Sequence, residues 1–195
     1  MNTTVLQQLS RSITSVGAAA LLAACAAEAP LTPDSQADLS GRSSPAAPSL
    51  ARLDLGVCGD LRAPEGSTGG FRMYAEGVQI YRWNGSSWAF VAPRAVLYAD
   101  ANGKGMVGTH YAGPRWQSVS GSTVKGAVID RCIADPNAIP WLSIAATYEG
   151  GPGVFQKVTF IQRVNTVGGM APTENGSVTG EVREVPYTAE YYFYR

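Results

Sequence analysis

Short runs of β-branched and aromatic residues, broken by turn residues, constrain the fold of this chain more than any other feature. The runs recur at intervals of roughly 8–12 residues, which is typical of all-β domains. No stretch of useful length has the 3.6-residue apolar period of a surface helix. Without helices for parallel crossovers, antiparallel pairing is favoured. We therefore expect an all-β fold, either an antiparallel sandwich or a partly closed barrel of about eight to ten strands.

The alternation is clearest in residues 153–166 and 187–195. In the first run, Gln162 shares a face with Val158, Phe160 and Val164, so Arg163 lies on the other face. In the second run, Tyr187, Ala189, Tyr191 and Phe193 share one face. Further strands are expected at 71–83, 88–91, 95–99, 106–111, 124–132 and 141–148.

Turn residues predict how some of the expected strands are connected. Asn84-Gly85 and Asn102-Gly103 predict hairpins with type I′ turns, in which both central residues have positive φ. Gly77 is the expected kink of residues 71–83, which form a strand pair or a bulged strand. Asp100–Lys104 resembles a calcium loop, but it lacks the further spaced acids, so a plain hairpin is expected.

The N-terminal quarter of the chain differs in composition from the rest. All 18 aromatic residues follow residue 50. Residues 26–50 hold four prolines among Ala, Ser, Asp and Gln. Such a segment cannot bury enough apolar area to offset its ordering entropy. We expect a flexible tether there, followed by a single β-rich domain over residues 51–195.

The first 25 residues carry Arg11 as their one charge and then an apolar run that ends in Leu22-Ala23-Ala24-Cys25. A basic start, a short apolar stretch and small residues are typical of a signal peptide. The last four residues also resemble a bacterial lipobox, in which Cys25 is acylated and several acyl chains anchor the protein. We expect a lipoprotein signal peptide at 1–24, and the lipidated cysteine and tether at 25–50. The alternative is a plain signal peptide with an incidental cysteine.

The net charge and the number of possible metal ligands exclude some classes of function. Fifteen Lys and Arg balance fifteen Asp and Glu, so the chain lacks the basic surplus of a general nucleic-acid binder. With one histidine and no Cys/His spacing suited to zinc, we expect no metal and no cofactor. The expected partners are a membrane, through the lipid, and a carbohydrate or small-molecule ligand. The oligomeric state stays open.

Several ordered segments resemble a family of secreted bacterial and fungal proteins, domain of unknown function 3455. They include Gly77–Tyr81, His110–Pro114, Ala138–Leu142, Ile161–Thr166 and Val185–Tyr187. The resemblance implies an exported all-β domain without an established activity. Some fungal members carry a malate dehydrogenase label, which this sequence does not support, because it has neither a G-x-G-x-x-G turn nor a βαβ pattern.

The resemblance also shows a departure in the cysteines. Many members of the family have one after Gln-Ile-Tyr and one after Ala-Pro, where this chain has Trp83 and the Glu174–Ser177 segment. Its own Cys58 and Cys132 lie elsewhere. In an exported protein such a pair is most simply a disulfide. The alternative is two buried free thiols.

Five side chains are candidates for a site. His110 is the only residue with an unperturbed pKa suited to proton transfer near neutrality, although it also fits an ordinary hydrogen bond to a loop carbonyl. Arg163 suits a carboxylate or phosphate, or a cross-strand ion pair with Glu190. Gln162, Trp116 and Trp141 are ligand-binding candidates, and core packing is the alternative for each tryptophan.

These observations leave three functional hypotheses. The first is a lipid-anchored cell-envelope domain, at the cell membrane or outer membrane, that binds a ligand or envelope component without catalysis. The second is an envelope hydrolase or lyase acting on carbohydrate through His110 and Arg163. The third is a purely structural envelope protein. Convergence of His110, Arg163, Gln162 and a tryptophan in one pocket would favour the second.

Overall fold

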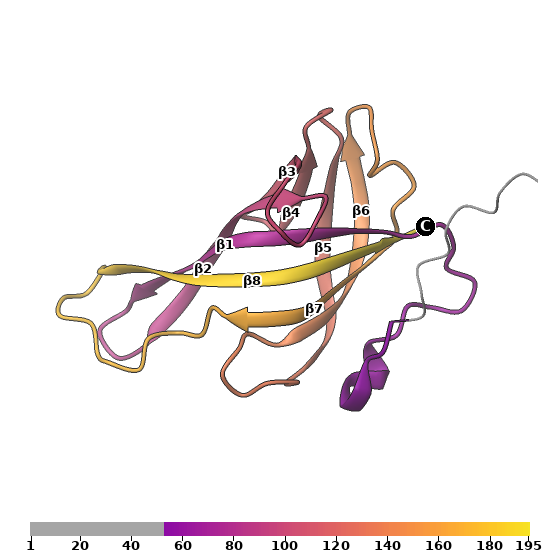
Figure 1. Cartoon of the computed structure of the whole chain (residues 1–195). Coiled ribbons are helices and arrows are strands. Elements are labelled where there is room, and N and C mark those ends of the chain that lie inside the picture. Colours follow the sequence, from indigo (N-terminus) through magenta and orange to yellow (C-terminus); the bar gives the residue numbers. More distant parts are fainter. Residues whose placement is uncertain (1–52) are drawn as a thin grey trace, which may run out of the picture. The chain divides into compact units, whose positions relative to one another are not determined.

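A computed structural model describes residues 53–195 and shows eight antiparallel strands in one sheet that closes on itself (Figure 1). Each strand pairs with the next, and β8 pairs with β1, so the order gives a closed barrel. The all-β prediction is confirmed, and the arrangement is a single closing sheet. A 3₁₀ helix η1 (Gly56–Leu61) precedes β1 (Phe71–Trp83), β2 (Trp88–Tyr98), β3 (Met106–Tyr111), β4 (Arg115–Ser118), β5 (Thr123–Cys132), β6 (Trp141–Gly150), β7 (Phe160–Gly168) and β8 (Val182–Tyr194).

The inward-facing residues follow from the pairing register. Tyr191 of β8 lies opposite Met73 of β1 and opposite Arg163 of β7. Directly paired residues point to the same side of a sheet, so these three side chains face the interior together. The predicted face of β8 is confirmed, because Tyr187, Ala189, Tyr191 and Phe193 all belong to the main core.

Several predicted strand boundaries change. Residues 153–158 form turns rather than a strand, and Lys157 has a φ of 65°, which a strand does not allow. Residues 71–83 form one strand whose register shift lies between Ile80 and Tyr81, so Gly77 is not the kink. The runs at 88–91 and 95–99 are one strand that continues through Pro93.

The two Asn-Gly turns form, but not as type I′. Only the glycines, Gly85 and Gly103, have positive φ. The Asn84 side-chain oxygen instead accepts hydrogen bonds from the backbone N–H groups of Ser86 and Ser87. These side-chain hydrogen bonds stabilise the first turn, although Asn84 itself does not have a positive φ.

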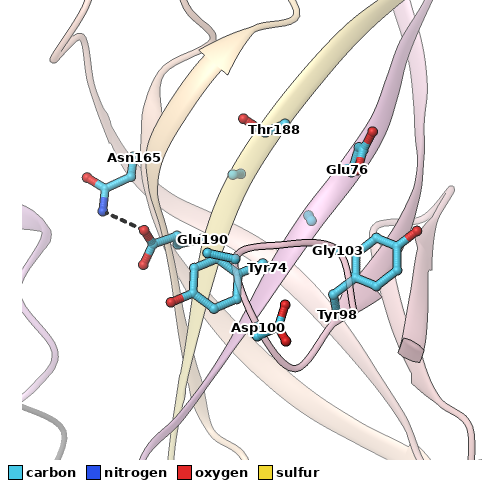
Figure 2. A pocket seen from close by; sticks show the side chains of 11 residues that line it. Tyr74, Glu76, Tyr98, Asp100, Gly103, Asn165, Thr188 and Glu190 are labelled. Atoms are coloured by element: carbon cyan, nitrogen blue, oxygen red, sulfur yellow. Dashed lines mark hydrogen bonds between the residues drawn. The ribbon is translucent and has the colours of Figure 1, made fainter. Parts of the chain in front are cut away.

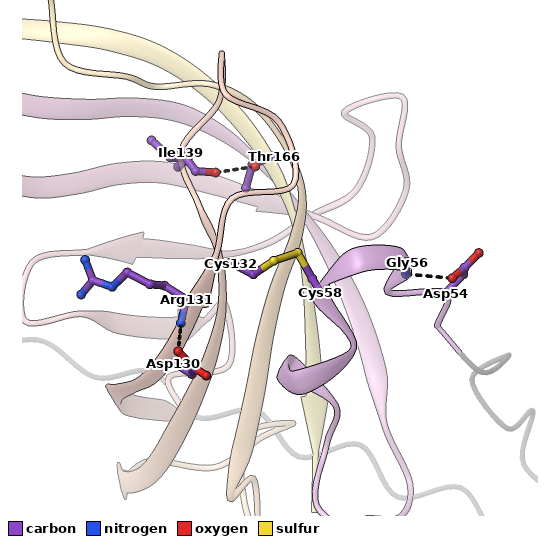
Figure 3. Close-up of a disulfide and its surroundings, with 8 residues drawn as sticks. All are labelled: Asp54, Gly56, Cys58, Asp130, Arg131, Cys132, Ile139 and Thr166. Atoms are coloured by element: carbon purple, nitrogen blue, oxygen red, sulfur yellow. Dashed lines mark hydrogen bonds between the residues drawn. A yellow bond between two sulfur atoms is a disulfide. The ribbon is translucent and has the colours of Figure 1, made fainter.

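The segment before β1 packs on the outer face of the barrel. Cys58 in η1 and Cys132 at the end of β5 form a disulfide (Figure 3), which confirms the predicted pairing. With a sequence separation of 74, a cross-link of this kind stabilises by at most about 4–5 kcal/mol through loop entropy. Leu55 of the same segment packs against Val164 and Tyr192, so a second, smaller core forms outside the barrel.

The departure from the family's cysteine pattern has a structural counterpart. Trp83 lies directly against Gly176, leaving no room for a Cβ at that position. The end of β1 at Trp83 and the Glu174–Ser177 segment are therefore in contact. The contact between them is the buried Trp83 ring packed against Gly176.

The expected signal peptide at 1–24, the acylation of Cys25 and the tether up to residue 50 lie outside the described residues. In the part of the chain that is described, no helix is long and apolar enough to cross a membrane.

Candidate functional site

A cavity of about 280 Å³ lies in the interior of the barrel, and we call it the Arg163 cavity. Its polar lining comes from five strands: Gln79 of β1, His110 of β3, Trp116 of β4, Arg163 of β7 and Tyr191 of β8. The rest of the lining is apolar or glycine: Phe90, Val91, Pro93, Gly113, Pro114, Val128, Leu142 and Ile144.

Arg163 points inward because it pairs with Leu142 on one side and Tyr191 on the other. Its Nε and Nη2 groups donate to the Pro140 carbonyl at 3.2 and 2.7 Å. The ion pairs found within residues 53–195 all involve other arginines, so no described carboxylate neutralises Arg163. A half-buried cation without a counter-ion is unusual, because charges removed from water are normally paired.

Unpaired polar atoms gather around the same space. Among the described residues, four buried side-chain atoms lack a hydrogen-bond partner: Gln79 Nε2, Trp116 Nε1, Tyr187 Oη and Tyr191 Oη. Three of them belong to residues that line the Arg163 cavity. Each such buried group costs about 1–3 kcal/mol when it stays unpaired. This part of the interior is therefore built at a cost in stability.

His110 is neutral in this environment. Its Nδ1 lies 2.9 Å from the Arg115 carbonyl oxygen, so Nδ1 carries the proton and donates it. The imidazole ring stacks on the Trp116 ring, with 4.3 Å between the ring centroids. It packs edge-on against the Tyr191 ring, with 5.2 Å between the centroids. Burial lowers the pKa of His110 to about 3, with a further contribution from the Arg163 charge, although the carbonyl bond acts the other way. The ring is thus a weak base, with Nε2 as an acceptor.

The two buried tyrosines stay protonated. Burial raises the pKa of both Tyr191 and Tyr187, and the nearby Arg163 charge lowers both only in part. A protonated phenol can donate a hydrogen bond. The polar part of the lining is accordingly rich in donors and, within the described residues, contains no Asp or Glu.

Three of the five predicted site residues meet in this cavity, namely His110, Trp116 and Arg163. Gln162 and Trp141 do not, because both lie on the outer face of the barrel. Trp141 packs beside the Leu55 cluster. Gln162 donates to the Leu61 carbonyl and accepts from the Tyr194 hydroxyl, both at 2.7 Å.

Alternation correctly puts Gln162 and Arg163 on opposite faces, and the pairing shows that the Arg163 face is the one that meets the barrel interior. The first half of β7, from Phe160 to Val164, is covered on both faces, by the barrel interior on one side and by the η1 segment on the other. Gln162 is a fully paired amide, as a core position demands, but it lies under η1. The suggested ion pair with Glu190 does not form, because Glu190 contacts Arg72 and Asn165 instead.

Two lining residues, Gln79 and Tyr191, were missed as site candidates. The alternation in 187–195 correctly assigned Tyr191 to a buried face, but a tyrosine in that place is indistinguishable from core packing. Gln79 is a single polar residue in a strand, and only its position across from Pro93 of β2 places it at the cavity.

A second, smaller cavity of about 200 Å³ lies by the pairing of β1 and β8 (Figure 2). Tyr74, Glu76, Tyr98, Asp100 and Glu190 line it, and Figure 2 shows Asn165 donating to Glu190. The Asp100 side chain already accepts hydrogen bonds from two backbone N–H groups of its hairpin. Within residues 53–195, no group of acidic, histidine or cysteine side chains is arranged to hold a metal ion.

Comparison with known proteins adds the family but no activity. No curated protein and no solved structure matches the chain. The family described as "Protein of unknown function (DUF3455)" matches residues 64–195, well over half of the chain and every strand of the barrel. The all-β barrel with its interior cavity therefore belongs to a member of the DUF3455 family.

Proposed function

We propose that this protein is an exported, lipid-anchored domain of the bacterial cell envelope that binds a small ligand in the Arg163 cavity without catalysing a reaction. The observation that carries the proposal is the lining of that cavity. It combines an arginine that no described carboxylate neutralises with several buried donors that have no partner.

Buried polar groups in native proteins are nearly always hydrogen-bonded, and exceptions need an explanation. Here three of the four exceptions among the described residues line one apolar-walled cavity. Small-molecule sites commonly have this composition, a mostly apolar pocket with a few convergent polar groups. A bound ligand would supply the missing partners.

The alternative, a carbohydrate hydrolase or lyase that uses His110, draws support from the convergence of His110, Arg163 and Trp116. Two observations count against it. A pKa of about 3 makes His110 a poor proton acceptor near neutrality. Glycoside hydrolysis normally requires a pair of carboxylates, and the described lining of the cavity has none.

The envelope location rests on the sequence of the N-terminus. Leu22–Cys25 follows an apolar run, and a proline-containing tether of some 25 residues separates Cys25 from the barrel. Intact-mass measurement of the mature protein tests this part. We expect an N-terminal Cys25 that carries acyl chains, and a Cys25→Ser variant that leaves the membrane fraction. An unmodified mature N-terminus would contradict the anchor.

Ligand binding is tested by blocking the cavity. We expect some compounds of a small-metabolite library to raise the melting temperature of the exported protein. Leu142→Trp, which fills the cavity from its lining, should abolish these shifts. Val178→Trp, at an exposed position away from the strands, is the matched control and should keep them. The proposal fails if no compound stabilises the protein, or if Leu142→Trp responds like the control.

A further inference from the structure

We infer that the ligand of the Arg163 cavity is a small organic acid, a single carboxylate carried on an apolar body. The inference rests on the proposed function, because it names the chemical class that the same cavity accepts. The hydrogen-bonding character, the charge and the walls of the cavity each point to this class.

The unpaired polar groups of the cavity are mostly hydrogen-bond donors, so a ligand would have to offer hydrogen-bond acceptors. Trp116 Nε1 and Gln79 Nε2 can only donate hydrogen bonds, and both are buried and unpaired. The protonated Tyr191 hydroxyl is a third buried donor; no partner lies at hydrogen-bond distance, although Tyr187 and Arg163 are close to it. A carboxylate offers only acceptor sites, about four in all, and so fits a cluster of donors better than a hydroxyl or an amide.

The charge of the cavity selects for an anion with one negative charge. Arg163 is the only cationic side chain in the described lining, and His110 is neutral. Pro140 uses the N–H groups on one edge of the guanidinium, so those on Nη1 and the second on Nη2 remain for a ligand. That remaining edge presents parallel donors, which match the two oxygens of a carboxylate. A phosphate dianion would keep an uncompensated charge in this setting.

The walls indicate that the rest of the ligand is apolar. Phe90, Val91 and Val128 line the cavity and are also large hydrophobic side chains exposed to solvent. Leu142 and Ile144 continue the apolar surface inward. An acid with an aromatic or short aliphatic body would cover these residues from water while its head reaches Arg163. A volume of about 280 Å³ is at the small end for ligand sites, which excludes large lipids from full enclosure.

A neutral sugar fits this lining less well. Sugar hydroxyls donate as well as accept, and the unpaired polar atoms of this lining are mostly donors, with His110 Nε2 and Gln79 Oε1 as acceptors. An amine ligand would meet the Arg163 charge at short range, which costs free energy in a partly buried site. Both classes therefore serve as comparison ligands.

The test compares ligands that share a carbon skeleton. Benzoate, benzamide, benzylamine and the neutral sugar glucose are titrated by calorimetry into the exported full chain held in lipid nanodiscs, with empty nanodiscs as the blank. Octanoate and octanamide repeat the comparison with an aliphatic body. We expect at least one acid to bind about 10- to 100-fold more tightly than its amide, as expected for hydrogen bonds to a charged group, and benzylamine not to bind.

Arg163→Gln should lower the affinity for the acid to that for the amide and leave the affinity for the amide unchanged. Arg94→Gln is the matched control, since Arg94 pairs with Glu184 on an exposed surface, and it should not change either affinity. Should Arg163→Gln not fold, the ligand series on the unmodified protein decides the matter by itself.

Two results would overturn the inference, and they differ in what else they overturn. If an amide or a neutral sugar binds as tightly as the acid, and Leu142→Trp prevents that binding, then the ligand class is wrong and the binding function stands. If none of the acids, amides, amines or sugars binds, and the metabolite library gives no thermal shift, both the class and the proposed function fall.

Discussion

Two parts of the same barrel interior are built in opposite ways, although they lie only two residues apart along β8. Around Phe193, the rings of Phe71, Phe155 and Phe193 pack with centroids 4.9 to 6.0 Å apart. Around Tyr191, the interior holds Arg163 and the unpaired donors of the cavity. The first part follows the normal rule of dense apolar packing, and the second departs from it.

The difference traces to what fills each part. The segment between β6 and β7 inserts Phe155 and Val158 into the core, which completes the packing around Phe193. By contrast, the Arg163 cavity is bordered by Phe90, Val91 and Val128, which remain exposed. One sheet thus provides a stabilising core and a ligand site in neighbouring layers of its inner face, and the contacts of Phe193 with Trp116 and Tyr191 join the two layers.

The largest expected effect is on the apolar part. Phe193→Ala should lower the free energy of unfolding by about 3–5 kcal/mol, because it removes a fully buried ring and leaves a cavity. Urea denaturation measures the loss. Val178→Ala, at an exposed position, should change stability by less than about 0.5 kcal/mol. A loss below about 1 kcal/mol for Phe193→Ala would show that this region is not the stabilising core.

The polar part should make stability depend on pH. The pKa of His110 is about 3 in the folded protein and near 6.5 when unfolded. Between these values the unfolded chain binds a proton that the folded chain does not, so stability falls as pH decreases. Between neutral pH and pH 5 the loss from His110 is about 2 kcal/mol.

The contribution of His110 is isolated by comparing its variant with the unmodified protein at each pH. His110→Phe, which keeps a ring beside Trp116, should make the acid-side loss smaller by this amount. Urea denaturation at several pH values measures both slopes. Parallel slopes would mean that His110 becomes protonated in the folded state near its ordinary pKa.

The smallest expected effect separates a paired tyrosine from an unpaired one. Tyr81→Phe removes a buried hydrogen bond of 2.7 Å to the Gly169 carbonyl and should cost about 1–2 kcal/mol. Tyr191→Phe removes a hydroxyl with no partner at hydrogen-bond distance, beside Tyr187 and Arg163, so its effect on stability should be smaller than that of Tyr81→Phe. The same variant should weaken acid binding several-fold. Equal destabilisation by the two variants would indicate that the Tyr191 hydroxyl is already paired in the ligand-free protein.

Part of the candidate site was predictable from residue types. His110, as the only histidine, and Arg163, within a strongly alternating run, are candidates from the sequence alone, and both line the cavity. The face of β8 was also correct, because every second residue from Tyr187 to Phe193 is apolar or aromatic. Period-two patterns are local, so a single strand is enough to reveal them.

The errors concern information that no single strand contains. In β7, alternation separated Gln162 from Arg163 correctly, but it could not say which of the two faces meets the barrel interior. Both faces of the first half of this strand are covered, so apolar content does not distinguish them. Trp141 is a ligand-binding candidate by residue type, but its contacts place it in the outer cluster under the η1 segment.

By itself, the sequence determined the all-β class and favoured antiparallel pairing of neighbouring strands, because these depend on local periodicity, turn residues and composition. It left Cys58 and Cys132 as a disulfide or two free thiols, and the structure shows the disulfide. Only the tertiary structure decided that the sheet closes and that Arg163, His110, Trp116, Gln79 and Tyr191 meet in one space. The physical reason is register. Which side chains share a layer of a closed barrel depends on how strands far apart in the chain align, and a shift by one residue would turn Arg163 outward.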